Sequence, residues 1–356
     1  MRLSQFGWDG RFSGLFKELG RDDLEPARVL LESARVYTLV GETGEIQAGV
    51  SGRFQHRAAE RKDFPVVGDW VAVESDAGAD QAVIHEVLPR NSAFLRKEAG
   101  KRTQAQVIAA NIDTVFLVSG LDGDFNPGRV ERYLMMAWES GAKPVVVLNK
   151  ADLCADLDRA VDTIEAVAPS VPVLPVSAVA ETGIERLTEH ICATKTVAFL
   201  GSSGVGKSSL VNLILGTDKQ QVRDVREDDS RGRHTTTHSQ LFVIPGGGIV
   251  MDTPGLRELQ VWSDGEGLAR AFNDIEELSA NCRFRDCEHD REPGCAIRQA
   301  LDDGTLPARR WQSYEKLKSE LNYLAGRQDE QAKLAEKKRK KELALQIKQI
   351  KNRPRT

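Results

Sequence analysis

The sequence has no long hydrophobic run: its longest apolar stretches, such as residues 114–119 and 144–148, have the length of a strand. A helix that crosses a bilayer needs ~18 or more consecutive apolar residues, so we expect no membrane span. The first ten residues, MRLSQFGWDG, lack the basic and then apolar order of a signal peptide. Only five residues are cysteine, too few for a disulfide framework in a chain of this length. These absences predict a cytoplasmic protein without a membrane partner.

A strong net charge is also missing, because the 356 residues sum to −4. The charge is nevertheless unevenly distributed. Residues 333–356 contain ten Lys or Arg and two Glu, so this segment carries +8 and the remainder −12. A basic tail of this kind is a candidate for binding polyanions, and its alternative is a disordered solubilising segment. Apolar residues make up 40%, enough for buried cores, and the length suggests two or three domains.

Hydrophobic periodicity divides the chain into segments. Residues 1–33 read as a polar leader with a short helix, and residues 34–98 as several short strands with glycine-rich turns. That second pattern favours a small β-barrel, with a sandwich as the alternative. From 99 to 262 strands alternate with helices, which predicts an α/β domain with a mainly parallel sheet. Residues 263–330 are expected to be mostly helical around a Cys/His cluster, and 331–356 form the basic tail.

A phosphate-binding loop is the strongest motif in the α/β segment. The sequence GSSGVGKS fits G-x-x-x-x-G-K-[ST], and it lies between a predicted strand, TVAFL, and a predicted helix, LVNLIL. Backbone N–H groups of such a loop surround a β-phosphate, the lysine reaches the β- and γ-oxygens, and the serine ligates Mg²⁺. The predicted nucleotide-binding residues here are Gly201, Ser202, Ser203, Gly204, Val205, Gly206, Lys207, Ser208 and Ser209.

Two further loops indicate that the nucleotide is GTP or GDP. Asn149, Lys150 and Asp152 belong to an N-K-x-D sequence that directly follows a predicted buried strand. A carboxylate at Asp152 can accept both N–H groups of the guanine edge, and adenine would leave it unpaired. Ser177 and Ala178, at the end of the next strand, resemble the loop that contacts guanine O6. A P-loop ATPase or kinase is therefore disfavoured.

The order of these elements is unusual. Asp252 and Gly255 belong to a D-x-x-G sequence, DTPG, in which the aspartate would hold Mg²⁺ through water and the glycine amide would sense the γ-phosphate. Most GTPases run from P-loop to D-x-x-G and then N-K-x-D, whereas here N-K-x-D comes first. We interpret this as a circular permutation, which leads the chain from DTPG directly into the Cys/His region.

The Cys/His region offers four soft ligands within fourteen residues: Cys282, Cys287, His289 and Cys295. Three thiolates and an imidazole suit a closed, tetrahedral and therefore structural Zn²⁺ site. The alternatives are three reduced cysteines beside a histidine, or an iron–sulfur cluster, which histidine makes less favourable.

Taken together, the motifs resemble the ribosome small-subunit-dependent GTPase A family (RsgA/YjeQ), whose members are circularly permuted bacterial GTPases. The resemblance covers residues 35–320 and includes VIAANIDTVFLV, NKADL, GSSGVGKSSL, GRHTTT and DTPGLRE. It implies an OB-fold for the barrel and a zinc domain at 263–330. It also implies action on the 30S subunit and its 16S rRNA beside other assembly factors, with GTP hydrolysis stimulated by the subunit. The leader has no role in that pattern, and we expect a monomer.

The residues of the first switch lie between the P-loop helix and DTPG. One of Thr235, Thr236 and Thr237 is expected to close on Mg²⁺ and the γ-phosphate. Leu256 stands where Ras-like enzymes place a water-orienting glutamine, so another group must supply that function or hydrolysis is slow. His234 is the candidate, alongside Lys207, Ser208 and Asp252 as the predicted catalytic residues. The rival reading is an RNA-binding checkpoint protein that uses GTP only as a ligand.

Basic side chains of the predicted barrel could follow an RNA backbone. They lie in one loop and near the barrel exit, and ordinary solvated charge is the alternative. The set comprises Arg53, His56, Arg57, Arg61, Lys62, Arg90, Arg96, Lys97, Lys101 and Arg102.

Overall fold

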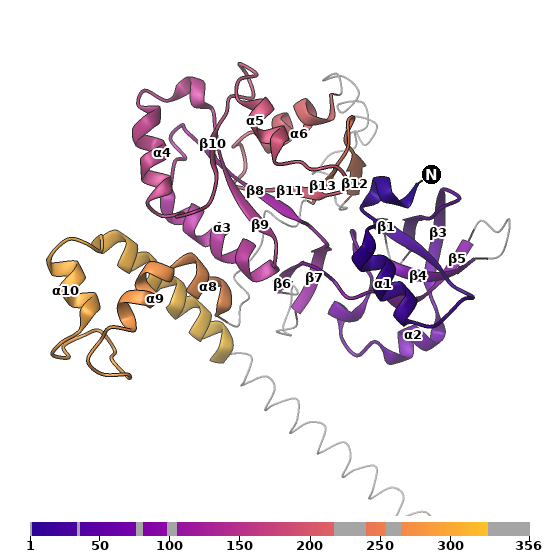
Figure 1. Ribbon diagram of the computed structural model, residues 1–356, viewed down its shortest axis with the longest axis horizontal. Coiled ribbons are helices and arrows are strands. Elements are labelled where there is room, and N and C mark those ends of the chain that lie inside the picture. Colours follow the sequence, from indigo (N-terminus) through magenta and orange to yellow (C-terminus); the bar gives the residue numbers. More distant parts are fainter. Residues whose placement is uncertain are drawn as a thin grey trace, which may run out of the picture.

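The computed structural model describes residues 2–33, 36–75, 81–97, 105–216, 240–253 and 265–326. Figure 1 shows three parts: a small barrel at the N-terminal end, a central α/β domain and a helical C-terminal part. No helix among these residues is long and apolar enough to cross a membrane.

The first part is a closed five-stranded barrel, which confirms the barrel and excludes the sandwich. The strands follow one another in the order β1-β2-β3-β5-β4, and β4 pairs again with β1 to close the cylinder. Val29, Tyr37, Leu39, Val71 and Ile84 fill its interior. The strands are β1 (Glu25–Ser33), β2 (Val36–Val40), β3 (Glu45–Val50), β4 (Trp70–Ser75) and β5 (Gln81–Val87), with α2 (Gly52–Arg57) and η2 (Arg61–Asp63) between β3 and β4.

Strand β1 corrects the predicted boundary of the leader at residue 33, because the barrel already begins at Glu25. The strand escapes pattern analysis for two reasons. Its register shifts between Val29 and Leu31, and it carries a buried arginine, Arg28, so apolar and polar residues do not alternate along it.

The rest of the leader packs on the barrel. It contains η1 (Leu3–Phe6) and α1 (Gly10–Glu18), and the Asp9 side chain caps α1 by accepting hydrogen bonds from two backbone N–H groups. The ring of Trp8 meets Trp70 of β4 edge-on at 4.7 Å, and Phe12 lies 5.8 Å from the same indole. The leader thus completes the core rather than trailing from it.

The central domain contains a six-stranded sheet in the order β10-β9-β8-β11-β13-β12, parallel except for β12. Successive residues of β8 point into different cores: Val115 and Leu117 into one, Phe116 and Val118 into the other. Helices therefore cover both faces, which agrees with the predicted α/β domain. The strands are β8 (Thr114–Gly120), β9 (Lys143–Asn149), β10 (Val173–Pro175), β11 (Thr196–Leu200), β12 (Gln240–Val243) and β13 (Ile249–Asp252). The helices are α3 (Pro127–Ser140), η3 (Ala151–Leu153), α4 (Leu157–Glu165), α5 (Ile184–Glu189) and α6 (Lys207–Leu215).

The barrel joins this domain in two ways. A two-stranded sheet of β6 (Ala93–Lys97) and β7 (Ala105–Ala110) lies between them, and β1 pairs with β12 at Leu31 and Gln240.

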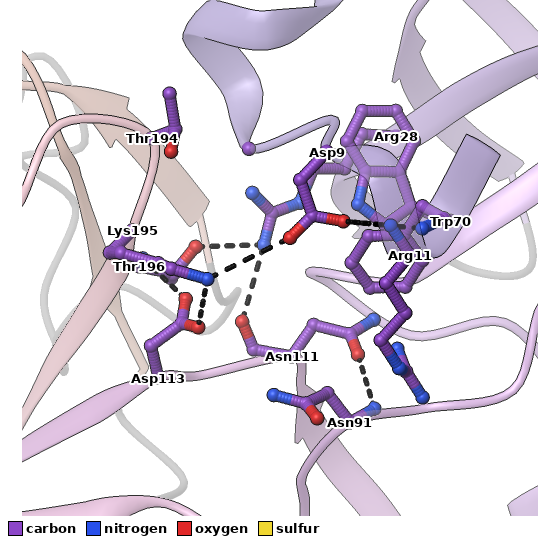
Figure 2. A pocket seen from close by; sticks show the side chains of 12 residues that line it. Asp9, Arg11, Arg28, Trp70, Asn91, Asn111, Asp113, Thr194, Lys195 and Thr196 are labelled. Carbon is purple, nitrogen blue, oxygen red and sulfur yellow. Dashed lines mark hydrogen bonds and ion pairs between the residues drawn. The ribbon is translucent and has the colours of Figure 1, made fainter. Parts of the chain in front are cut away.

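A polar joint is centred on Arg28, which donates to Thr196 Oγ1 at 2.8 Å and to the Asn111 carbonyl at 3.4 Å. Figure 2 shows these bonds beside a cavity of about 200 Å³. Burial lowers the pKa of Arg28 to about 10, so the side chain is still a cation at neutral pH.

The C-terminal part is helical and packs on α3. Its first helical stretch is divided into α8 and α9, because Phe272 has a backbone conformation (φ −125°, ψ 40°) outside the helical region. Its ring is fully buried against Tyr314. The helices are α8 (Glu266–Ala271), α9 (Asn273–Ser279), α10 (Ala296–Asp302) and a helix over 308–326.

Candidate functional site

The predicted phosphate loop lies between β11 and α6, at the carboxyl edge of the sheet. Its glycines are structurally necessary. Gly206 has φ +94°, and a Cβ there would lie 2.2 Å from the side-chain nitrogen of Asn149. A Cβ at Gly201 would lie 2.4 Å from the Val118 carbonyl oxygen. Lys207 Nζ donates to the carbonyls of Gly201 and Ser202 at 2.6 and 2.5 Å, so the amine lies within the loop.

The two base-reading loops meet the phosphate loop through Asn149. This residue ends β9 and is buried, and its Nδ2 donates to the Val205 carbonyl at 2.8 Å. Its Oδ1 accepts from the backbone N–H of Ala178 at 3.1 Å. The Ser177 hydroxyl donates to the Asp152 carboxylate, which is exposed. The structure therefore brings together all three loops that the sequence suggested for a guanine nucleotide.

Asp252 ends β13, the strand parallel to β11 on the side away from β8. Parallel strands present their carboxyl ends at one edge, so this carboxylate lies on the same edge as the P-loop. Ser208, in the first turn of α6, is half-buried. A hydroxyl and a carboxylate are the oxygen ligands that Mg²⁺ takes beside nucleotide phosphates, so these residues fit that ion.

The predicted switch residues lie outside the described part of the chain. They are His234, Thr235, Thr236, Thr237, Gly255 and Leu256.

Three residues of the site were missed by sequence reasoning. After β8, Asp122 accepts a bond from Lys150 Nζ at 2.5 Å, and Asp124 accepts one from the Ser202 hydroxyl at 2.6 Å. Arg129, in the first turn of α3, donates to Ser202 Oγ at 2.7 Å. The sequence does carry one indication of them, because Asp122 and Asp124 form an acidic pair directly after a buried strand. That is the position where α/β sheets place ligand-binding groups.

The four predicted zinc ligands form a cluster in which all ligand atoms lie within 4.8 Å of one another. His289 Nδ1 lies 3.4 Å from Cys295 Sγ and 3.6 Å from Cys282 Sγ, and the two sulfurs are 4.0 Å apart. Separations of this size suit the corners of a tetrahedron around one ion. Desolvation and the neighbouring thiols raise the pKa of Cys287 to about 11. The cluster therefore fits a structural zinc ion.

Residues around the cluster orient its histidine. His289 Nε2 lies 3.2 Å from the Ser279 hydroxyl, and the imidazole meets the Trp311 ring edge-on at 5.6 Å. A hydrogen bond at Nε2 leaves Nδ1 as the metal-binding atom. Ser279 is thus a supporting residue that the ligand spacing alone did not reveal.

The basic residues of the barrel are less available than their sequence suggests. Arg90 donates to the fully buried Asp69 at 2.7 Å and to the Phe64 carbonyl at 2.9 Å. Arg57 pairs with Glu86 and Arg61 with Glu32. Arg90 is therefore a structural residue of the barrel, and Arg57 and Arg61 are each balanced by a carboxylate, which weakens the case for a continuous phosphate-binding surface there.

The segment of the zinc region from Cys282 to Arg298, in contrast, exposes four arginines. Figure 1 shows this part beside the central domain. Phe284 is also 41% exposed, and the guanidinium of Arg283 lies 5.5 Å from its ring. The exposed set is Arg283, Arg285, Arg291 and Arg298.

Comparison with known proteins agrees with this geometry. A model of the RsgA GTPase family matches residues 87–262. The small ribosomal subunit biogenesis GTPase RsgA of Opitutus terrae is 48% identical over 96% of both chains. RsgA 1 of Oceanobacillus iheyensis is 45% identical over 92% of this chain and 93% of its own.

Solved structures agree as well. The crystal structure of YjeQ from Thermotoga maritima aligns with a TM-score of 0.64 and 29% identity, covering 84% of this chain and 98% of that one. YloQ, a circularly permuted GTPase, aligns with a TM-score of 0.61 and 28% identity, covering 85% and 96%. The motif order, the three-part architecture and these similarities lead to one conclusion: this chain belongs to the RsgA GTPase family.

Proposed function

We propose that the protein hydrolyses GTP and acts late in assembly of the small ribosomal subunit. In this proposal the GTP form binds the 30S subunit and its 16S rRNA, promotes release of other assembly factors, and leaves after subunit-stimulated hydrolysis. The convergence of Asn149 on both the phosphate loop and Ala178 supports the nucleotide part of the proposal, because it brings the phosphate loop beside the two loops to which we assign guanine recognition. The names of the relatives support the ribosomal part.

The residues of the site have distinct tasks in this reaction. Asp152 reads the guanine edge, and the N–H groups of the phosphate loop bind the β-phosphate. Lys207, whose amine donates to the carbonyls of Gly201 and Ser202, would also donate to the β- and γ-oxygens. Ser208 and Asp252 would hold Mg²⁺, which supplies neutralisation of charge on the β- and γ-phosphates when bound.

Hydrolysis also needs a group that orients water. Leu256 cannot do so, and we assign that task to His234, with one of Thr235, Thr236 and Thr237 closing on the γ-phosphate. His234→Ala should then lose subunit-stimulated turnover. If it keeps full turnover, the assignment is wrong.

We further propose that Cys282, Cys287, His289 and Cys295 bind one zinc ion that holds the C-terminal part in shape. Metal analysis of protein purified without chelator should find one zinc per chain, and its absence would exclude the site.

RNA contact is assigned to the zinc region and to the tail over 331–356. The exposed arginines and Phe284 support the first, since stacking and phosphate contacts are how proteins hold RNA. Deleting residues 333–356 should weaken a steeply salt-dependent binding to the subunit. Unchanged binding would leave the tail as a solubilising segment. A monomeric, cytoplasmic protein fits these tasks.

One experiment separates this function from its rival, the checkpoint protein that only binds GTP. The GTPase rate is measured with and without purified 30S subunits. Stimulation supports the enzyme, and binding of GTP without turnover in either condition supports the rival.

A further inference from the structure

An ion pair outside the recognised motifs reaches the phosphate loop. Arg129 Nη1, in the first turn of α3, donates to Asp124 Oδ2 at 2.5 Å and to the Ser202 hydroxyl oxygen at 2.7 Å. The Ser202 hydroxyl in turn donates to Asp124 Oδ2 at 2.6 Å. Ser202 therefore lies in a closed cycle of three hydrogen bonds, each of which involves a charged group, and it takes part in two of them. Charge-assisted bonds of this length are the stronger class of hydrogen bond in proteins.

Stability of the fold alone does not explain this arrangement. The side chains of Arg129 and Asp124 are 33% and 36% exposed, and pairs with such exposure contribute at most ~1 kcal/mol. Both groups remain charged at neutral pH. Arg129 and the Ser202 hydroxyl lower the pKa of Asp124, and Asp124 raises the pKa of Arg129. The cycle therefore contributes less to the stability of the fold than to the position of the residues that it joins.

What it fixes is one end of the phosphate loop. The Ser202 carbonyl accepts a bond from Lys207 Nζ, the amine that reaches the β- and γ-oxygens in loops of this type. The same residue thus touches Lys207 through its main chain and Arg129 through its side chain. A shift of Ser202 would move the part of the loop that lies beside the transferred phosphate.

We propose that Arg129 is a positioning residue for GTP hydrolysis, acting with Asp124 through Ser202 to hold the β/γ end of the phosphate loop in its working shape. This rests on the proposed GTPase function and adds to it a residue outside the family's motifs. A phosphate loop that is already held in place loses less conformational entropy when the transition state forms. Misplacing a catalytic group by ~1 Å can lower the rate up to ~100-fold.

The test uses the full chain, four single variants and the double variant that combines Ser202→Ala with Arg129→Gln. Arg129→Gln removes the charge, Arg129→Lys restores it without the planar fork, and Ser202→Ala removes the anchor. Arg159→Gln, on the exposed face of α4, is the matched control. Steady-state hydrolysis gives kcat and KM for GTP, equilibrium titration gives the Kd for GDP, and circular dichroism reports folding.

We expect Arg129→Gln to lower kcat by ~10- to 100-fold with a much smaller change in the Kd for GDP, because the effect lies at the γ-side of the loop. Arg129→Lys should recover part of the loss, and Arg159→Gln should behave as wild type. In the Ser202→Ala background, Arg129→Gln should have almost no further effect, since the two act as one unit.

Three results would overturn the proposal. Arg129→Gln with wild-type kcat would remove the positioning role while leaving the GTPase function intact. An equal loss in both backgrounds would show that Arg129 does not act through Ser202. A wild-type chain that does not hydrolyse GTP, with or without 30S subunits, would refute the proposed function itself. If Arg129→Gln does not fold, Asp124→Asn makes the same test from the other side of the pair.

Discussion

Arg310 joins the C-terminal part to the central domain, and replacing it should separate the two. This side chain is 4% exposed, and its Nη1 lies 2.7 Å from Glu131 of α3. Its other nitrogens donate to Asp274 of α9 at 2.6 and 2.8 Å. Burial lowers its pKa, but the hydrogen bonds and charges of Asp274 and Glu131 outweigh that effect and raise it above the usual value. It is therefore a buried cation held by two carboxylates.

The magnitude follows from what Arg310→Met leaves behind. Glu131 is only 2% exposed, and among the described residues it would keep one donor, the Ser313 hydroxyl at 2.5 Å. Removing one partner of a buried pair costs ~3–5 kcal/mol because the other charge stays buried and unpaired. Asp274 adds little, since its side chain is 40% exposed and can be solvated again. A loss of ~3–5 kcal/mol is a large share of the ~5–15 kcal/mol that holds a domain folded.

Urea unfolding followed by tryptophan fluorescence measures this loss, because Trp311 lies in the affected region and stacks on Tyr314 at 5.4 Å. The neighbouring Arg309, which is exposed, gives the matched control Arg309→Met. The double variant Glu131→Gln with Arg310→Met should recover most of the loss, since it removes the stranded charge. A cost below ~1 kcal/mol, or a double variant no more stable than Arg310→Met, would refute the reasoning.

Three further predictions concern other sites. Ser279→Ala should lower zinc affinity by ~10- to 100-fold, measured by competition with a chromophoric chelator; unchanged affinity would show that the serine does not orient His289. Asp152→Asn should weaken GTP binding by ~100-fold or more and favour xanthosine triphosphate in nucleotide competition, and retained GTP preference would contradict the base-reading assignment. Arg28→Met should destabilise the joint of barrel and central domain by ~3 kcal/mol, since several buried acceptors lose their donor; a melting temperature equal to wild type would argue against that.

Local motifs made much of the nucleotide site predictable. The phosphate loop, the N-K-x-D loop and the Cys/His cluster each consist of residues close in sequence, so their spacing carries their geometry. Barrel closure was harder to predict, because it depends on pairing between β1 and β4, whose strands lie far apart along the chain. The bulge and the buried Arg28 then concealed β1 itself.

The supporting residues were unpredictable, and the reason is a different one. Arg129 lies 73 positions from Ser202, and Arg310 lies 179 positions from Glu131, so no local pattern connects them. Charge alone was also misleading. Arg90 was predicted to face RNA, yet it is bonded to the buried Asp69, because sequence does not indicate which acid lies opposite a given base.

The position of these residues on α3 bears on how the parts of the protein communicate. The sequence suggested one route, from DTPG directly into the zinc region. Helix α3 offers a second, since Arg129 reaches the phosphate loop while Glu131 binds Arg310. Residues two apart project about 200° from one another around a helix, so a single turn of α3 faces both partners. The bonds to Ser202 and to Arg310 therefore lie on the same turn of α3, so the phosphate end of the GTP site and the C-terminal part share one contact segment of the central domain.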